Sequence, residues 1–353
     1  MRPICEFEFL ILLLVFPLCF YYGRNKTSNK NGGVDLATSN AIKGMACVFI
    51  LMGHYETILY NITGNKPVGF SNLIWHTTAN IALVLFMYFS GYGLSLKREH
   101  ENLLPILLKR LGKVYIPLMY MSVITIIVYT LMPENGSLED LTKICASDLW
   151  YVHHINKDVL YEVLLPRLFG WPDWYVFCIM IFYLLFYLSL MISHKVMIPQ
   201  TYFLWIFMCL YFIIAYVYLG PQEAHWYHFC WVFFGGHLHA LWGELATLQR
   251  KTYSILFVLL TSTILIESKW MILSYLIGIL TIAAFTHICN KYTVNSKLLA
   301  FLGSISYFFY LSHIRIGYQL MTYMNINSVI LWVLLTCFIS WMLKIMYKKL
   351  CGF

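Results

Sequence analysis

Long apolar runs separated by short polar segments recur along the whole chain. After a first run at 7–22, ten more lie near 42–59, 73–96, 104–131, 174–193, 199–219, 226–246, 253–267, 270–288, 299–322 and 329–346. Most of these runs reach about 18 residues, the length that a helix needs to cross a bilayer. We therefore expect an all-α polytopic membrane protein with about ten transmembrane helices and a short N-terminal hydrophobic helix.

The first apolar run differs from the others because Glu6 and Glu8 lie at its start. It lacks the basic start and the small-residue cleavage site of a signal peptide, so we interpret it as an extra membrane helix or as an interfacial anchor. A polar, basic segment follows it. We assign 1–35 to an N-terminal hydrophobic helix with a cytoplasmic linker, and 36–350 to one transmembrane domain.

The composition excludes a soluble globular protein. Of 353 residues, 60% are apolar and 11% are charged, whereas soluble domains are about half apolar and a quarter charged. No polar stretch is long enough for a separate soluble domain, so chemistry must take place in the helical bundle or in an outer loop. The ten cysteines occur singly, without a CxxC pair. We expect neither a disulfide framework nor a metal site.

The net charge of +8 is distributed as in a membrane protein. Basic pairs lie at the ends of apolar runs, where they determine topology, so we expect no nucleic-acid partner. If 23–42 is cytoplasmic, sixteen Lys and Arg residues fall on the cytoplasmic side. Only five fall outside: Lys66, Lys143, Lys157, Arg167 and Lys269. This bias also predicts a cytoplasmic C terminus.

The longest connection, 132–173, is expected on the outer side and is rich in acidic and aromatic residues. Loops of this length in a compact bundle are often functional. Carboxylates such as that of Asp173 accept hydrogen bonds, and rings such as that of Trp174 stack on sugars, so the segment suits a hydroxyl-rich ligand. The alternative is a solvated loop with interfacial aromatic residues.

Ionisable residues inside a membrane span are costly to insert and are therefore candidates for function. Lys43 and His54 lie eleven residues apart on the first long run. This spacing corresponds to about 1100° of helical rotation and about 16 Å of rise, so both side chains are on one face. In the alternative interpretation Lys43 snorkels to the cytoplasmic headgroups, and His54 is an ordinary interfacial residue.

Two other groups of ionisable residues stand out. Arg110 and Lys113 share a helix face at the cytoplasmic start of the third long run, where two cations suit an anionic ligand such as a nucleotide phosphate; the alternative is topogenic charge. His313 and Arg315 lie on the ninth run, with Arg315 towards the outer half. We expect Arg315 to pair with a carboxylate or to line a polar cavity, and structural ion pairing is the alternative to catalysis here.

Five short motifs occur in order on the first four long runs and on the ninth. They are Lys43 with His54, Phe86-Met-Tyr-Phe89-Ser90-Gly91-Tyr92, Arg110-Leu-Gly-Lys113 with Pro117, Trp174-Tyr-Val-Phe, and Ser306-Tyr307-Phe-Phe-Tyr310-Leu-Ser-His313. Together, over about 36 to 346, they resemble the integral-membrane acyltransferase-3 family, the O-acyltransferases of cell-surface and secreted carbohydrates. The chain departs from the family pattern at Lys113, which lacks the planar fork of arginine.

The resemblance implies a membrane O-acyltransferase, in the first place an O-acetyltransferase. It would move an acyl group from cytosolic acyl-CoA (acetyl-CoA) to a hydroxyl of a cell-surface or lipid-linked polysaccharide, without a metal, in a bacterial inner (plasma) membrane. A secondary transporter of a small polar solute is the alternative, although the chain lacks the internal repeats that are usual there.

The resemblance and the residue chemistry together suggest a role for each candidate residue. The candidate catalytic residues are His54, as general base or as acyl-accepting nucleophile, and Lys43. Arg110 and Lys113 would meet the phosphates of CoA. A turn at Ser90 and Gly91 would allow close approach of the backbone. Weaker candidates for binding the acceptor are Asp173, Trp174, His313 and Arg315.

Overall fold

The computed structural model describes 2–26, 34–65, 68–96, 103–131, 174–220, 225–242, 276–278, 280–285, 288–289, 292–322 and 327–351. The chain forms two compact units. Unit 1 contains Met1–Leu96 and Gly235–Phe353, and unit 2 contains Lys97–Phe234. The N-terminal hydrophobic helix therefore belongs to the same unit as the first and last long helices.

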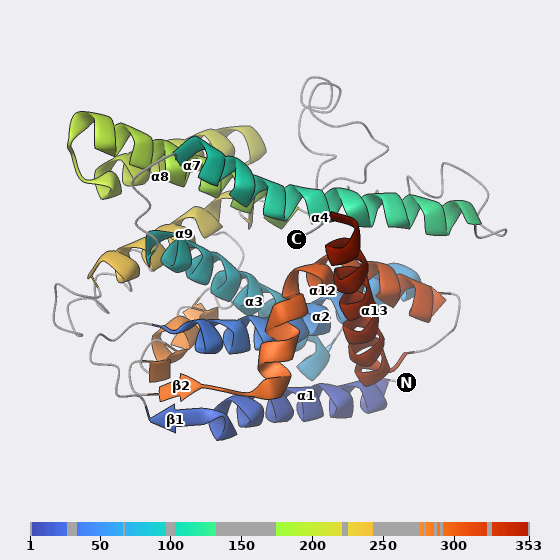
Figure 1. The fold of residues 1–353 in the computed structure, drawn as a ribbon. Helices are drawn as coiled ribbons and strands as arrows, with labels where there is room; N and C mark the ends of the chain where they lie inside the picture. The colour runs from blue at the N-terminus through green and yellow to red at the C-terminus, as the bar shows by residue number, and fades with distance from the viewer. Residues whose placement is uncertain are drawn as a thin grey trace. The chain divides into compact units, whose positions relative to one another are not determined.

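Unit 1 is a helical bundle with one short β-ladder (Figure 1). Its main elements are α1 (Arg2–Tyr22), β1 (Arg24–Lys26), α2 (Leu36–Thr63), α3 (Gly69–Leu96), β2 (Tyr292–Val294), α12 (Lys297–Thr322) and α13 (Val329–Cys351). Unit 2 contains α4 (Leu103–Leu131), α7 (Trp174–Val196), α8 (Gln200–Leu219) and the first part of α9 (His225–Trp242), whose last residues belong to unit 1.

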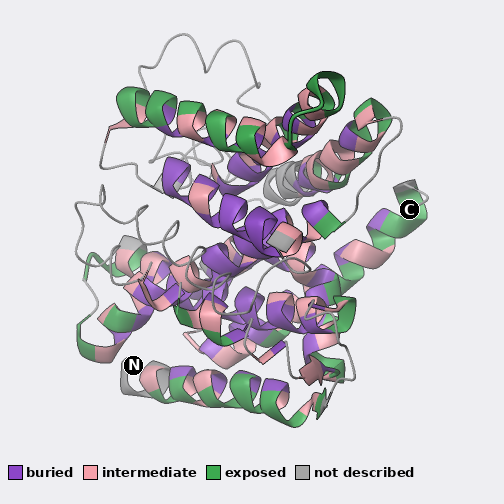
Figure 2. Cartoon of the chain, turned by 90° about the vertical axis from the view of Figure 1, so that its left-hand side faces the viewer, coloured by how far each residue is buried: buried purple, intermediate pink, exposed green. Residues whose placement is uncertain are grey.

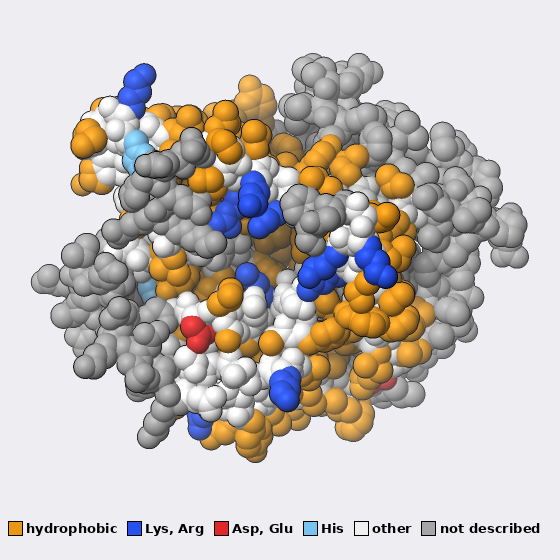
Figure 3. Space-filling model, in the orientation of Figure 1, with side chains coloured by type: hydrophobic (Ala, Val, Ile, Leu, Met, Phe, Trp, Pro, Cys, Tyr) orange, Lys and Arg blue, Asp and Glu red, His pale blue; other side chains and the backbone are white. Residues whose placement is uncertain are grey.

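The structure confirms the prediction of a helical membrane protein. Within the described residues, six helices are long and apolar enough to cross a membrane: Leu36–Tyr60, Gly69–Leu96, Trp174–Val196, Gln200–Leu219, Lys297–Ile314 and Val329–Leu350. Figure 3 shows a surface that is largely hydrophobic, with Lys and Arg side chains in separate groups. The apolar run at 253–267 and the loop at 132–173 lie outside the described residues. The expected total of ten spans therefore stays a prediction.

The β-ladder is the one departure from an all-α fold among the described residues. The polar segment after α1, expected to be a linker, pairs antiparallel with the strand before α12, with Arg24 opposite Val294 and Lys26 opposite Tyr292. The Arg24 guanidinium carbon lies 3.6 Å from the centroid of the Tyr21 ring, a cation–π arrangement. The ladder thus joins the end of α1 to the start of α12.

Helix α1 packs on the bundle with one face. Phe9, Leu12, Phe16 and Phe20 are buried, and their spacing of three or four residues forms one helical stripe. The opposite face exposes apolar side chains, seen as green segments of the helix that begins at N in Figure 2. Apolar side chains therefore lie on both faces of α1.

Helix α2 has defined ends that follow from its sequence. The Asp35 side chain accepts a hydrogen bond from the Thr38 amide at 2.6 Å, which caps the start. Gly64 ends the helix with a φ of 69°, a left-handed conformation that glycine adopts without strain. The 28-residue helix between these caps carries both Lys43 and His54.

Helices α2 and α12 run parallel and touch through their backbones. A side chain at Gly303 would collide with the carbonyl oxygen of Asn40, and one at Gly44 would collide with the carbonyl oxygen of Leu299. The Cys47 thiol lies 3.7 Å from the Ser306 carbonyl oxygen further along both helices. Small residues permit such close crossings between membrane helices, where van der Waals packing replaces the hydrophobic effect.

Helices α3 and α13 complete the bundle by running antiparallel to their neighbours. On one side of α2, Trp75 Nε1 of α3 donates to Thr57 Oγ1 at 2.9 Å. On the far side of α12, Lys344 Nζ of α13 donates to the Ser304 carbonyl at 2.7 Å. Unit 1 therefore has two ends: a ladder end, with β1 and β2, and a Glu8 end, with the start of α1 and of α13.

The α2–α12 crossing generates the first testable prediction. Gly303→Ala should lower the melting temperature of the detergent-solubilised protein, since overpacking typically costs about 1–3 kcal/mol. Gly93→Ala in α3 is the matched control, because nothing lies within 4 Å of a Cβ built there. Thermal unfolding followed by size-exclusion chromatography measures both. Equal melting temperatures for the two variants would contradict the close crossing.

Candidate active site

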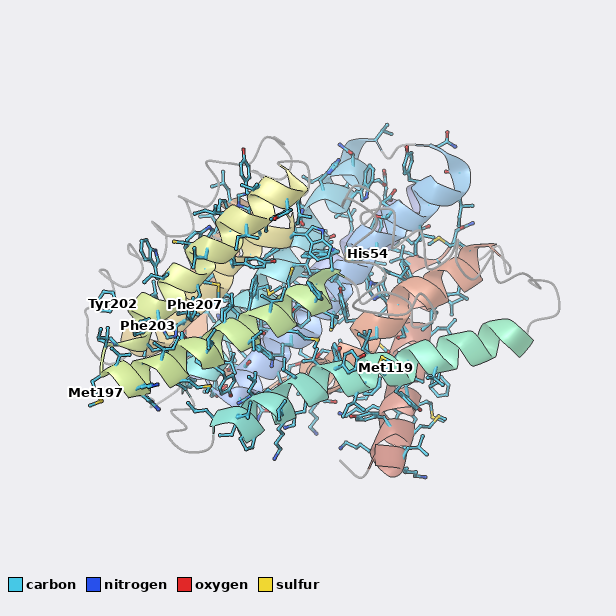
Figure 4. The ribbon with its side chains drawn as sticks, turned by 90° about the horizontal axis from the view of Figure 1, so that it is seen from above. His54, Met119, Met197, Tyr202, Phe203 and Phe207 are labelled. Carbon is cyan, nitrogen blue, oxygen red and sulfur yellow. The ribbon has the colours of Figure 1, made fainter. Side chains whose placement is uncertain are left out.

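His54 and His313 face each other across the α2–α12 interface. Their ring centroids lie 5.0 Å apart, with the ring planes at 70°. His54 is half-buried and His313 is buried; Figure 4 labels His54 on α2. Each histidine follows the crossing glycine of its own helix, Gly44 or Gly303, by ten residues, which is about 15 Å of helical rise. The parallel register therefore brings the two rings to one level.

The orientation of the His313 ring is determined by its own helix. Nδ1 lies 2.6 Å from the Tyr310 carbonyl oxygen and 3.2 Å from that of Phe309. A carbonyl oxygen can only accept, so Nδ1 carries the hydrogen and donates it. In this tautomer Nε2 is the nitrogen that can take up a proton.

Trp332 of α13 holds His313 from the opposite side. Its Nε1 donates to the His313 carbonyl oxygen at 2.8 Å, and the two rings stack with centroids 6.4 Å apart. The indole is 1% exposed and lies against Gly317, where a Cβ would collide with it. The ring of Tyr55, the residue after His54, lies on another side of the Trp332 indole, with ring centroids 5.9 Å apart. The histidine pair is thus enclosed by well-packed aromatic side chains.

Lys43 lies at the other end of the same helix. It is half-buried on α2, towards the ladder end. Gly53 lies opposite Ala79 and Thr57 opposite Trp75, and this antiparallel register continues to place Lys43 at the level of Phe89, next to Ser90. Lysine and histidine on α2 therefore mark two levels of unit 1, about 16 Å apart along the axis.

The expected turn at Ser90 and Gly91 is wrong, because α3 continues through both residues to Leu96. Glycine is tolerated within long apolar membrane helices, and the Ser95 hydroxyl bonds back to the Gly91 carbonyl at 2.8 Å. The close backbone approach on α3 is made instead by Gly236 of α9, whose position leaves no room for a Cβ beside the Tyr88 carbonyl.

Two histidines of α9 follow this glycine contact in the chain and bond to α3. His237 Nδ1 lies 2.7 Å from Ser95 Oγ, and His239 Nδ1 lies 2.8 Å from the Tyr88 hydroxyl. Because they are two residues apart on a helix, their side chains diverge by about 200°. Among the described residues, no three His, Cys, Asp or Glu side chains come together as metal ligands.

The basic pair lies in unit 2, whereas both histidines, Lys43 and Ser90 belong to unit 1. Arg110 is half-buried and Lys113 is exposed on α4, and Pro117 lies inside the same helix. Both cations are thus carried by one continuous helix, as the three-residue spacing predicts.

The remaining candidates are only partly described. Trp174, the first residue of α7, stacks on Phe229 of α9 with centroids 5.6 Å apart, so one face of its ring is occupied within unit 2. Arg315 lies in α12, but its side chain is outside the described residues. Asp173 is outside them entirely.

The pairing of His54 with His313 was not predicted from the sequence, which ranked His313 only as a weak acceptor residue. The sequence does contain a signal for this pairing, because ten residues separate Gly44 from His54 and ten separate Gly303 from His313. The supporting residues Tyr55 and Trp332 carry no sequence signal of their own, since aromatic residues are abundant throughout the chain.

Comparison with curated proteins and with solved structures finds no match to this chain. The acyltransferase-3 family model, described as an acyltransferase domain, matches residues 36–345. This range contains α2 and α12 with the histidine pair, and α4 with the basic pair. A transporter is therefore not retained as an alternative. The chain belongs to the acyltransferase-3 family and is a membrane acyltransferase.

Proposed function

We propose that the protein transfers an acetyl group from cytosolic acetyl-CoA to a hydroxyl of a cell-surface or lipid-linked polysaccharide, with His54 as the general base. The observation that carries this proposal is the His54–His313 pair, with ring centroids 5.0 Å apart, at the parallel crossing of α2 and α12. Membership of an acyltransferase family supplies the reaction class.

The chemistry follows from what two neighbouring imidazoles can do. The acceptor hydroxyl attacks the thioester carbonyl while neutral His54 takes its proton, a contribution typically of about 10²–10⁴-fold. The carbon–sulfur bond then breaks, and the proton is returned to the departing CoA thiolate. The products are the ester and free CoA thiol. His313 lies where it can orient the His54 ring and share the proton.

A second route uses the same residue as a nucleophile. His54 attacks the thioester first, releases CoA and carries the acetyl group to the acceptor. The two routes differ in whether acetyl is held covalently on the protein without an acceptor. Mass spectrometry of protein incubated with acetyl-CoA alone distinguishes them.

We assign the ladder end of unit 1 to the cytoplasm. Six described basic residues belong to this end: Arg24, Lys26, Lys297, Lys344, Lys348 and Lys349. Glu6 and Glu8 belong to the opposite end. Positive charge is retained on the cytoplasmic side, so Lys43 would lie near the inner surface and His54 further out, in a bacterial plasma membrane with a cytoplasmic C terminus.

The donor and the acceptor would then approach from opposite sides. Arg110 and Lys113 on α4 would bind the phosphates of CoA, for which Arg offers two parallel donors and Lys a point charge. The sugar hydroxyl would reach His54 from the outer side, with Asp173, Trp174 and Arg315 as candidate acceptor residues.

The central prediction concerns His54. His54→Ala should abolish release of free thiol from acetyl-CoA by purified protein, and His54→Gln should be equally inactive, because an amide cannot accept a proton at neutral pH. His194→Gln, on the exposed end of α7, is the control. His54→Gln combined with His313→Gln should be no worse than His54→Gln alone, since residues that act as a unit are not additive. Substantial activity in either His54 variant would move catalysis elsewhere.

The donor site generates a separate prediction. Arg110→Ala should raise the apparent KM for acetyl-CoA more than Lys113→Ala, and Lys113→Arg should be tolerated, because only arginine offers a bidentate fork. Steady-state kinetics at varied acetyl-CoA measure this. Lys109→Ala removes one neighbouring exposed charge and should leave KM unchanged. Equal effects of all three alanine variants would favour a purely topogenic role.

The topology can be tested in cells. In a cysteine-free variant, single cysteines placed within 132–173 should react with an impermeant thiol reagent, and those placed within 97–102 should react only after lysis. The sixteen-to-five distribution of basic residues motivates this expectation. The reverse pattern would remove the argument for a cytosolic donor.

A further inference from the structure

The N-terminal helix α1 precedes the residues matched by the family model. It nevertheless contacts Tyr55 and the start of α13, which pack around the histidine pair. The matched range begins at residue 36, and α1 ends at Tyr22. Glu6 and Glu8 are unusual at the start of an apolar helix, because a carboxylate at membrane depth is costly. Glu8 finds its partners on α13.

The Glu8 carboxylate caps the first turn of α13. Its Oε1 accepts from the Ser328 hydroxyl at 2.8 Å, and its Oε2 accepts from the amides of Val329 and Ile330, the latter at 3.3 Å. These amides have no partners within the helix, and a negative charge at a helix N terminus is favourable. Ser328 Oγ itself accepts from the Leu331 amide at 3.2 Å, so the Glu8 side chain of α1 adds to the local cap of α13.

The turn that Glu8 holds contains Trp332. The Trp332 amide donates to the Ser328 carbonyl at 3.1 Å, so the indole is anchored to the same turn. Trp332 in turn donates to the His313 carbonyl and stacks on its ring. Glu8 is therefore connected to the histidine pair by consecutive contacts.

A second contact links α1 to the other histidine helix. Phe9, next to Glu8, meets the Tyr55 ring edge to face, with centroids 5.5 Å apart. Tyr55 adjoins His54 in the chain, and its hydroxyl donates to the Asn327 carbonyl just before α13, at 2.8 Å. One turn of α1 thereby contacts Tyr55, next to His54, and the first turn of α13, which carries Trp332.

We propose that Glu8 is a positioning residue for acyl transfer: by capping α13 it holds Trp332 against His313, and so holds the His313 ring against His54. This inference rests on the proposed function of the histidine pair. It makes α1 part of the active structure, although α1 contributes no group to the reaction itself.

The test compares Glu8→Ala with Glu6→Ala, two residues earlier on the same helix. Glu6 Oε1 accepts from the Ser71 hydroxyl of α3 at 3.4 Å, so loss of the Glu6 carboxylate leaves the α13 cap intact. Glu8→Ala should lower kcat about tenfold or more at an unchanged KM for acetyl-CoA, because small misplacements of catalytic groups cost up to about 10²-fold. Glu6→Ala should retain wild-type kcat.

Two conservative variants separate positioning from stability. Glu8→Gln keeps an oxygen acceptor for the α13 amides and should recover part of the lost kcat. Trp332→Phe keeps a ring but loses the donor to the His313 carbonyl, and should reproduce the fall in kcat. If Glu8→Ala fails to insert into the membrane, the kcat values of Glu8→Gln and Trp332→Phe test the positioning role. Wild-type kcat in the Glu8 variants, or an equal loss in Glu6→Ala, would overturn the proposal.

A readout without turnover separates this proposal from the proposed function. Diethyl pyrocarbonate should modify His54 and His313 faster in Glu8→Ala than in the wild type or Glu6→Ala, as measured by mass spectrometry of the labelled peptides. If the wild type consumes no acetyl-CoA, the proposed function fails, while this comparison still tests Glu8. Equal labelling in all three proteins would overturn the positioning role.

Discussion

The backbone contact between α2 and α12 is the constraint on which the rest of unit 1 depends. Gly44 and Gly303 allow these helices to touch at the ladder end, where any side chain would collide with a carbonyl oxygen. In a bilayer, two apolar helices gain little from leaving lipid, so close packing of small residues selects their partner and register. Once that register is set, the positions of His54 and His313 follow, because both lie ten residues further along parallel helices.

The histidine pair shows how a membrane bundle can hold polar groups rigidly. His313 donates to a carbonyl of its own helix, and its own carbonyl accepts from Trp332. These bonds and the stacked indole leave the ring little freedom to rotate. Preorganised groups of this kind contribute to catalysis because they need no rearrangement when charge develops in the reaction.

The two glutamates at the start of α1 both accept hydrogen bonds from other helices or their caps. The buried stripe of α1 binds this helix to the bundle, the β-ladder holds one end, and Glu8 holds the other through α13. A carboxylate that is costly in lipid becomes favourable at a helix N terminus. Helix α1 and strand β1 thus pack within unit 1.

Sequence alone determined the class of protein and the chemistry available to it. Apolar runs predicted helices such as α2, α3 and α13, since burial in lipid requires about 18 consecutive apolar residues whatever the partner. Five ordered motifs predicted the family, and Lys43 and His54 were predicted on one helix face, which is a local property of 3.6 residues per turn. Tertiary structure alone decided that His313 lies beside His54 and that Glu8 caps α13. These depend on which helices touch and in what register, and such contacts join residues as much as 322 positions apart, beyond the reach of any local pattern.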